Sequence, residues 1–330
     1  METTRRAFVQ TLFTAATVAA VPAWAAPVPP PAVPAAEPGA LRFFALGDWG
    51  RRGEPHQRAV AARMGEEAAR VSPAFVLALG DNFYEDGVVS ASDPQWQTSF
   101  EEVYTAPSLH VPWYAVLGNH DYHSEPDAQI AYAAASPRWR MPARYYSRRF
   151  AIGTGDGKTQ ADFFFIDTNP MVNAYLTSGH LRLGSNTRAQ DVEGQVAWLR
   201  KALRESDAAW KIVVGHHPLY SGGLHDTDQL DIRARLLPVF KEGGVRAYFC
   251  GHDHDLQHIA SEGIDHFVSG GGSTVRDVQM MPESLFARKV SGFASVALGP
   301  ETLRLAYVDE AGKEIYSASL PCAAAPAHQA

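Results

Sequence analysis

Cysteine is scarce in this chain of 330 residues, since only Cys250 and Cys322 occur. A disulfide framework is therefore excluded, and we expect both thiols to be free. An excess of positive charge is also missing, because 29 Lys and Arg stand against 36 Asp and Glu, with a formal net charge of −7. This acidic balance argues against a nucleic-acid partner, which would require a basic face to neutralise phosphates. The hydrophobic fraction of 46% is ordinary for a globular protein.

The apolar run near the N-terminus is too short to span a bilayer. It covers residues 7–21, follows the pair Arg5-Arg6, and precedes Ala23-Trp24-Ala25, which offers small residues at the two cleavage-site positions. This pattern predicts a secretory signal peptide over residues 1–25, of the twin-arginine type whose passengers cross the membrane already folded. We therefore expect the twin-arginine export machinery as a partner, a periplasmic or secreted mature protein, and no stable membrane anchor after cleavage. A basic N-terminus followed by a membrane anchor is the alternative.

The remaining chain is predicted to form one domain between two irregular ends. Residues 26–40 are rich in proline and alanine, which is typical of a semi-rigid linker. The domain is expected over residues 41–320, and residues 321–330 are expected to form a loose tail that contains Cys322. The sequence shows no internal repeat.

Short apolar runs alternate with helical patterns along this domain. The runs predict buried strands over residues 41–46, 75–79, 113–117, 163–166, 212–214 and 247–250. Helical spacing predicts one helix with Val60, Met64, Ala68 and Val71 on its buried face, and a second with Val192, Val196, Leu199 and Leu203. A third is expected to start with Leu230, Ala234 and Leu237, to be interrupted at Pro238 and to end at Gly243-Gly244. Further strands at 264–268, 293–298 and 303–308 complete an α/β fold with a substantial late β contribution.

Histidine is abundant, with 13 copies, and several lie in polar clusters where the predicted strands end. Ligands of α/β sheets bind beyond the carboxyl ends of strands, so these loops should converge on one crevice. A glycine before each polar residue would let backbone segments approach closely. Because buried Asp and His side chains need partners, the clusters together indicate a metal site. They are Gly47-Asp48-Trp49-Gly50, Gly80-Asp81-Asn82-Phe83-Tyr84, Gly118-Asn119-His120-Asp121, Gly215-His216-His217-Pro218 and Gly251-His252-Asp253-His254.

These five motifs, in this order, resemble those of the purple acid phosphatases, a family of the calcineurin-like metallophosphoesterases. The similarity is to the small, single-domain, tartrate-resistant type, because no room exists before Leu41 for the extra β-domain of the two-domain plant form. The resemblance implies an α/β fold in which a β-sandwich of two mixed sheets is flanked by helices on both sides.

The resemblance also implies a binuclear metal centre of Fe³⁺ plus a divalent ion, which would be Fe²⁺, Zn²⁺ or Mn²⁺. Asp48, Tyr84 and His254 would hold the first ion, Asn119, His216 and His252 the second, and Asp81 would bridge them. The donor chemistry agrees, since phenolate and carboxylates suit Fe³⁺, whereas a neutral amide and two imidazoles suit a divalent ion. Tyr84 discriminates between functions, because a phosphodiesterase of the same superfamily is expected to lack it.

Five further residues are assigned to roles around the metals. The resemblance makes His120 and His225 the catalytic histidines, which bind substrate and deliver a proton to the leaving group. His225 lies in a glycine-rich loop that we expect to be free to cover the cleft. Asp121 is predicted to orient His120, and Asp253 to hold neighbouring residues, as partners of ligating histidines do. His217 is left with two alternatives, substrate contact or structure.

Other residues near the motifs receive simpler predictions. Trp49 and Phe83 are expected to wall the site. Cys250 is expected to be a small buried hydrophobe. The histidines predicted not to be ligands are His56, His110, His180, His266 and His328.

The resulting hypothesis is an acid phosphatase that hydrolyses phosphate monoesters by in-line attack of a metal-bound hydroxide on phosphorus. Small phosphate esters would be its substrates. A phosphodiesterase or nucleotide pyrophosphatase on the same scaffold is the first alternative, and the loops between residues 169 and 187 are expected to decide between this alternative and a monoesterase. A redox-active iron protein or a metal-dependent binding module is the alternative from a different class.

Overall fold

The computed structural model describes residues 36–322. The predicted signal peptide, most of the predicted linker and residues 323–330 lie outside the described residues. Within residues 36–322, no helix combines the length and apolar character that crossing a membrane requires.

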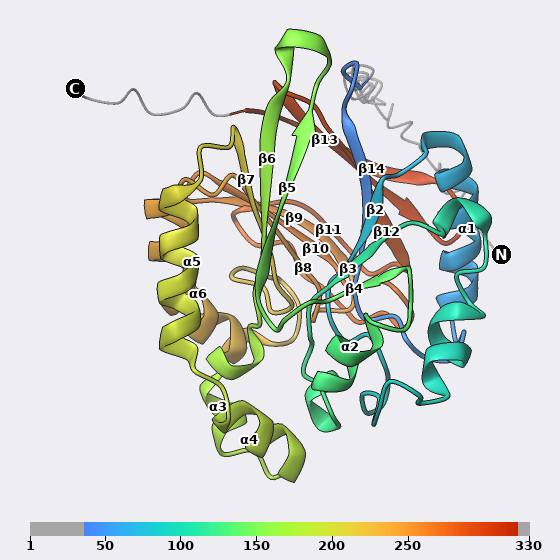
Figure 1. The fold of residues 1–330 in the computed structure, drawn as a ribbon, viewed down its shortest axis with the longest axis vertical. Helices are drawn as coiled ribbons and strands as arrows, with labels where there is room; N and C mark the ends of the chain where they lie inside the picture. The colour runs from blue at the N-terminus through green and yellow to red at the C-terminus, as the bar shows by residue number, and fades with distance from the viewer. Residues whose placement is uncertain (1–35, 323–330) are drawn as a thin grey trace, which may run out of the picture. The chain divides into compact units, whose positions relative to one another are not determined.

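Two seven-stranded mixed sheets form the centre of the domain (Figure 1). The first sheet has the order β14 (Glu314–Pro321), β13 (Thr302–Asp309), β12 (Gly292–Leu298), β1 (Leu41–Leu46), β2 (Phe75–Ala78), β3 (Trp113–Ala115) and β4 (Trp139–Arg140). The second has the order β11 (Ser284–Arg288), β9 (Leu256–Ser261), β10 (Ile264–Ser269), β8 (Ala247–Cys250), β7 (Trp210–Val214), β6 (Thr159–Phe165) and β5 (Tyr146–Ile152). Strands β1 to β3 are parallel to one another, as are β6 to β8.

The sheets pack face to face through aromatic side chains. Phe43 of β1 stacks on Phe75 of β2 with ring centroids 5.1 Å apart. It also meets two rings of the second sheet edge-on, Phe163 of β6 at 5.4 Å and Phe249 of β8 at 5.8 Å. All four side chains are buried, and edge-to-face contacts of this kind add to the free energy of burying the rings.

Helices cover both outer sides of the sandwich (Figure 1). They are α1 (Gln57–Val71), α2 (Asp127–Tyr132), α3 (Asn173–Leu176), α4 (Leu181–Arg188), α5 (Val192–Glu205) and α6 (Asp226–Gly243). Helix α1 packs on the first sheet, while α5 and α6 share a second apolar core with the other sheet. The β-sandwich flanked by helices is thereby confirmed.

Most predicted elements are present, and β1 and β8 match their predicted bounds residue for residue. Helices α1 and α5 bury the predicted faces, with Val71, Val192 and Val196 only partly covered. The fold extends slightly beyond residue 320, since β14 ends at Pro321 and the N–H of Cys322 donates to the carbonyl of Glu301 at 2.7 Å. Cys250 is buried, Cys322 is half-buried, and no disulfide joins them.

The prediction for the third helix was right about its end and wrong about Pro238. Helix α6 passes through Pro238 without interruption and ends at Gly243, with Gly244 as its C-cap at a φ of 69°. Proline is tolerated because the carbonyl that loses its N–H partner belongs to exposed Ala234, where water can reach it. The buried face contains Ile232, Leu236, Val239 and Phe240, whereas Leu230 is 55% exposed. The sequence offers two apolar stripes here, and only packing on the sheet selects one.

Candidate metal centre

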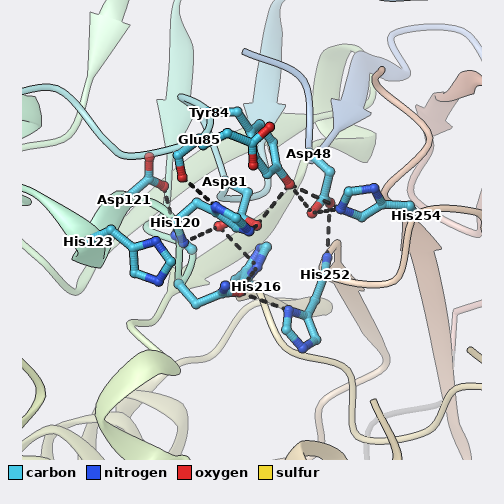
Figure 2. Close-up of polar contacts among 12 residues, drawn as sticks. Asp48, Asp81, Tyr84, Glu85, His120, Asp121, His123, His216, His252 and His254 are labelled. Carbon is cyan, nitrogen blue, oxygen red and sulfur yellow. Dashed lines mark hydrogen bonds and ion pairs between the residues drawn. The ribbon is translucent and has the colours of Figure 1, made fainter. Parts of the chain in front are cut away.

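The polar loops that follow β1, β2, β3, β7 and β8 meet at one place, which spans the two sheets (Figure 2). The seven predicted ligands all come from these loops. They are Asp48 after β1, Asp81 and Tyr84 after β2, Asn119 after β3, His216 after β7, and His252 and His254 after β8. The six that Figure 2 labels face a common centre, and Asn119 contacts two of them.

Three of these residues have backbone conformations that L-residues rarely adopt. The φ angles of Asp48, Asp81 and His252 are 62°, 50° and 71°. Such conformations cost on the order of 1–3 kcal/mol each and cluster at functional sites. The glycines before Asp81 and His252 leave space for other ligands, since a Cβ on Gly80 would lie 2.6 Å from Nδ1 of His216, and one on Gly251 would lie 2.4 Å from Oδ2 of Asp48.

The first ligand group is centred on the hydroxyl of Tyr84. This oxygen is 3.0 Å from Oδ1 of Asp48, 2.8 Å from Oδ2 of Asp81 and 3.1 Å from Nε2 of His254. One hydroxyl proton cannot satisfy both carboxylate oxygens at once. A hard cation among these atoms would, so the donor set fits Fe³⁺.

The second ligand group is centred on the side-chain oxygen of Asn119. This Oδ1 is 3.0 Å from Nδ1 of His252 and 3.3 Å from Nε2 of His216. Nε2 of His216 also lies 3.5 Å from Oδ1 of Asp81. Asp81 therefore presents one oxygen to each group, as its predicted bridging role requires.

The ligand side chains bring several buried acidic groups close together. Burial, together with the Asp81 charge, raises the pKa of Asp48 well above its usual value. Burial and both carboxylates likewise raise the pKa of the Tyr84 phenol. For Asp81, burial opposes ionisation, but the imidazoles of His216 and His120 hold its pKa below the usual range. Multivalent cations would offset this accumulation of buried acids, so the residues present fit a binuclear centre.

Residues outside the ligand set contact the ring nitrogen of each ligating histidine that does not face the centre. The other ring nitrogen of His216 contacts the carbonyl of Leu79 at 2.8 Å, and that of His254 contacts Oγ1 of Thr274 at 2.8 Å. Nε2 of His252 lies 3.2 Å from Oδ2 of Asp228. All three contacts fix ring orientation, and the Leu79 carbonyl and the Asp228 carboxylate, which only accept, also favour one tautomer of His216 and of His252.

Comparison with known proteins agrees with this geometry. The sequence matches the calcineurin-like phosphoesterase family over residues 41–256. Purple acid phosphatase 7 of Arabidopsis thaliana is 37% identical over 291 residues, which cover 86% of each protein. Tartrate-resistant acid phosphatase type 5 of Oryctolagus cuniculus is 32% identical over 303 residues, covering 85% of this chain and 91% of the relative. The chain belongs to the purple acid phosphatase family.

Solved structures support the same family fold. The structure of GAP50, described as the anchor in the inner membrane complex of Plasmodium, aligns with a TM-score of 0.76 and 26% identity, covering 86% of this chain and 89% of that one. Purple acid phosphatase PPD1 from yellow lupin aligns with a TM-score of 0.61 and 16% identity, covering 86% of this chain and 54% of that one. The second likeness shows the fold alone.

In this member of the purple acid phosphatase family, Asp121 does not contact the His120 side chain, so its predicted orienting role was wrong. The buried carboxylate accepts the backbone N–H groups of Gly118 at 2.8 Å and Asn82 at 3.2 Å. It therefore joins the loops after β2 and β3 and holds Asp81 in position between them. Burial and the nearby Asp81 charge raise the pKa of Asp121 to about 8.

Asp253 holds the loop that carries His225. Its Oδ1 lies 2.7 Å from Nδ1 of His225 and accepts the N–H of Leu224 at 3.2 Å, while Oδ2 accepts the hydroxyl of Ser221. Gly222 is also tied, since its N–H donates to Oε1 of Gln257 at 2.9 Å. The loop is therefore fixed at the edge of the site, and the expectation that it is free to move was wrong.

His217 is fully buried, and both ring nitrogens contact protein atoms. Nδ1 lies 2.7 Å from Oγ1 of Thr168, and Nε2 lies 3.0 Å from the hydroxyl of Tyr175. Burial and the His252 ring lower its pKa well below the usual value. These contacts favour structure over substrate contact.

The two predicted catalytic histidines lie at the site without joining either ligand group. Nδ1 of His120 contacts the carbonyl of Glu85 at 2.5 Å, and its Nε2 is 4.0 Å from Oδ2 of Asp81 (Figure 2). The ring of His225 packs against that of His252, with centroids 4.1 Å apart. Both imidazoles remain partly accessible to solvent, as residues that contact substrate require.

Two arginines complete the charges around the centre. The guanidinium of Arg51 lies 3.6 Å from the ring centroid of Tyr84 and pairs with Glu85. Nη1 of Arg276 donates to Nε2 of His225 at 3.3 Å. Sequence reasoning missed both arginines, together with Asp228 and Thr274, because none of the four belongs to a polar strand-end motif.

Trp49 and Phe83 do not wall the site, so that prediction was wrong. Both are fully buried, with ring centroids 5.7 Å apart. Trp49 also packs against Trp113 of β3 at 5.9 Å and Trp139 of β4 at 6.3 Å. They belong to an aromatic core, and each is the direct chain neighbour of a predicted ligand, Trp49 of Asp48 and Phe83 of Tyr84.

Proposed function

We propose that this protein is an exported acid phosphatase that hydrolyses small phosphate monoesters at a binuclear centre of Fe³⁺ and a divalent ion. One observation carries the proposal: the Tyr84 hydroxyl lies within hydrogen-bond distance of Asp48, Asp81 and His254. A phenolate with two carboxylates and one imidazole is a ligand set for a hard trivalent cation. The names of its relatives, purple and tartrate-resistant acid phosphatases, support the same activity.

The ligand side chains would place two cations on either side of Asp81. Asp48, Tyr84 and His254 would hold the first ion, and Asn119, His216 and His252 the second. When bound, the ions would supply positive charge for the phosphate and a water of lowered pKa as the nucleophile.

His120 and His225 would act on the substrate directly. His120 is positioned by the Glu85 carbonyl, and His225 by the Asp253 carboxylate. Each can donate a proton to a phosphate oxygen or to the leaving alkoxide, which contributes about 10²–10⁴-fold to the rate. Arg276, adjacent to His225, adds positive charge on the side where the ester would enter.

The twin-arginine pattern at Arg5-Arg6 supports export. A folded passenger can acquire its metals before it crosses the membrane, which suits a binuclear enzyme. The mature protein would then act in the periplasm or outside the cell, without a membrane anchor.

Metal depletion and reconstitution test the activity. Purified protein should lose hydrolysis of p-nitrophenyl phosphate after chelation, and should regain it with iron plus zinc or manganese. Bis(p-nitrophenyl) phosphate separates a phosphodiesterase, since a monoesterase should turn it over far more slowly. Peroxide chemistry without ester hydrolysis would favour the redox-active iron protein instead.

A further inference from the structure

A second group of metal-ligating side chains lies outside the binuclear centre, on the rim beside His120. It consists of Asp86, His123 and His180, whose ligand atoms all lie within 4.8 Å of one another. Nδ1 of His123 is 3.2 Å from Oδ1 of Asp86, and Nε2 of His180 is 4.0 Å from the same oxygen. The loop after β2, the 3₁₀ turn Asp121–His123 and the residue before α4 bring these side chains together.

A row of aromatic rings connects this rim group to the binuclear centre. The ring centroids of Tyr84 and His120 are 4.4 Å apart, those of His120 and His123 are 5.0 Å apart, and those of His123 and His180 are 4.1 Å apart. In Figure 2, His123 lies beyond His120, on the side of the site away from His254. His123 of the rim group therefore contacts the ring of His120, one of the two proposed catalytic histidines.

The chemistry of the group suits a borderline divalent cation. Stacked imidazoles do not both carry a proton without repulsion, and burial together with His120 and His180 lowers the pKa of His123. Two neutral imidazoles and one carboxylate are typical Zn²⁺ ligands, with water in the remaining position. We propose that Asp86, His123 and His180 form an additional, exchangeable site for a divalent cation such as Zn²⁺.

Binding would require a small rearrangement. Ligands at about 2.1 Å from Zn²⁺ are separated by about 3.4 Å, so the His180 ring must approach Asp86. Both side chains are exposed, at 41% and 64% of their surfaces, so this movement would displace few packed neighbours. Nδ1 of His180 accepts the N–H of Leu183 at 3.3 Å, and coordination through Nε2 would move the proton to Nδ1 and remove that long contact. The site is therefore weaker than the binuclear centre, and its ion exchanges.

Metal stoichiometry tests the site on the loaded enzyme. Holoenzyme equilibrated with Zn²⁺ at micromolar concentration should hold one equivalent more than His180→Ala or Asp86→Asn treated alike. The matched control is His56→Ala, since His56 pairs with Glu310 at 2.6 Å in a different part of the surface. It should retain the extra zinc. Unchanged visible absorption in every variant shows that the binuclear centre remains loaded.

Equal zinc content in the wild type, His180→Ala and Asp86→Asn would overturn the proposal. Loss of the extra zinc in His56→Ala would do so as well, because it would indicate scattered surface binding. His123→Gln provides a second variant if one of the first two fails to fold.

The rim ion would also bear on substrate choice, and this consequence rests on the proposed phosphatase function. A cation there lies near the His120 side of the entrance, where it would attract a second phosphate group. With zinc present, KM for pyrophosphate should be lower in the wild type than in His180→Ala, while KM for p-nitrophenyl phosphate stays equal. Equal KM values for pyrophosphate, with the extra zinc bound, would refute this consequence and leave both the site and the phosphatase standing.

Discussion

Asp253→Asn tests how the protein positions the proton donor of the phosphatase. The Asp253 carboxylate contacts Nδ1 of His225 at 2.7 Å. Burial opposes its ionisation, but His225 and His252 hold the pKa of Asp253 at about 2, so the group is charged throughout an assay between pH 5 and 7. The amide keeps the size of the side chain and removes the charge that stabilises an imidazolium at His225.

The expected loss follows from the energy of that contact. A hydrogen bond to a charged group contributes about 1.5–3 kcal/mol. Since about 1.4 kcal/mol corresponds to tenfold in rate, kcat should fall by about 10- to 150-fold. The loss cannot exceed that of His225→Ala, which removes the donor itself.

The assay compares a poor leaving group with a good one. For glycerol phosphate, whose alkoxide must be protonated, kcat should show the full loss in Asp253→Asn. For p-nitrophenyl phosphate, which needs little protonation, the loss should be several-fold smaller. The double variant Asp253→Asn/His225→Ala should be no slower than His225→Ala, because Asp253 acts through His225.

Two results would refute this reasoning. Additive losses in the double variant would mean that Asp253 acts independently of His225. Loss of iron or of the visible absorption would mean that Asp253 instead supports the adjacent ligands His252 and His254. Ser221→Ala is the control, because it removes another contact of the Asp253 carboxylate and leaves the charge in place.

Four further predictions address the ligands, the second catalytic histidine, pH and export. Tyr84→Phe should abolish the violet to pink charge-transfer absorbance and lower the iron content. The control is Tyr104→Phe, which changes a buried tyrosine outside both ligand groups and should keep the absorbance and the iron. A colourless, iron-free and fully active wild type would contradict the assignment. His120→Ala should keep both metals but lose about 10²–10⁴-fold in kcat on alkyl phosphates and less on aryl phosphates, and metal loss would show that the ligands were miscounted. In the metal-free protein, Asp121 should contribute less stability as pH rises from 6.5 to 8, because its raised pKa lets the folded state hold a proton that the unfolded state has released. This single contribution changes by at most about 1.4 kcal/mol per pH unit, so the stability of the wild type relative to Asp121→Asn in thermal unfolding should fall over this range. His216 and His254, whose folded-state pKa values burial lowers to about 4 and about 2, oppose this trend below about pH 7.5, because their unfolded forms still hold protons near the ordinary histidine pKa of about 6.5; the comparison with Asp121→Asn cancels their contribution. Arg5→Lys with Arg6→Lys should leave precursor in the cytoplasm in a fractionation experiment, and normal export of that variant would assign the signal to the general secretory route.

The sequence alone predicted the candidate ligands, through the resemblance of its motifs to the purple acid phosphatases, and determined the strands that carry them. Short runs of β-branched and aromatic residues are local signals, and they located β1 and β8 without error. The polar residues directly after such strands could be placed at one edge because strand ends in an α/β fold meet there. Asp48, Asp81 and His252 were therefore predictable, since each follows a glycine at a strand end.

Only the tertiary structure decided which residues support those ligands. Asp228 lies in α6 and Thr274 follows β10, so their contacts with His252 and His254 depend on how the chain closes, which no local pattern encodes. The same holds for Asp121, whose partners are backbone N–H groups that every residue possesses. The buried face of α6 likewise depended on packing, because two apolar stripes satisfy the helical period equally well and only the sheet beneath selects one of them.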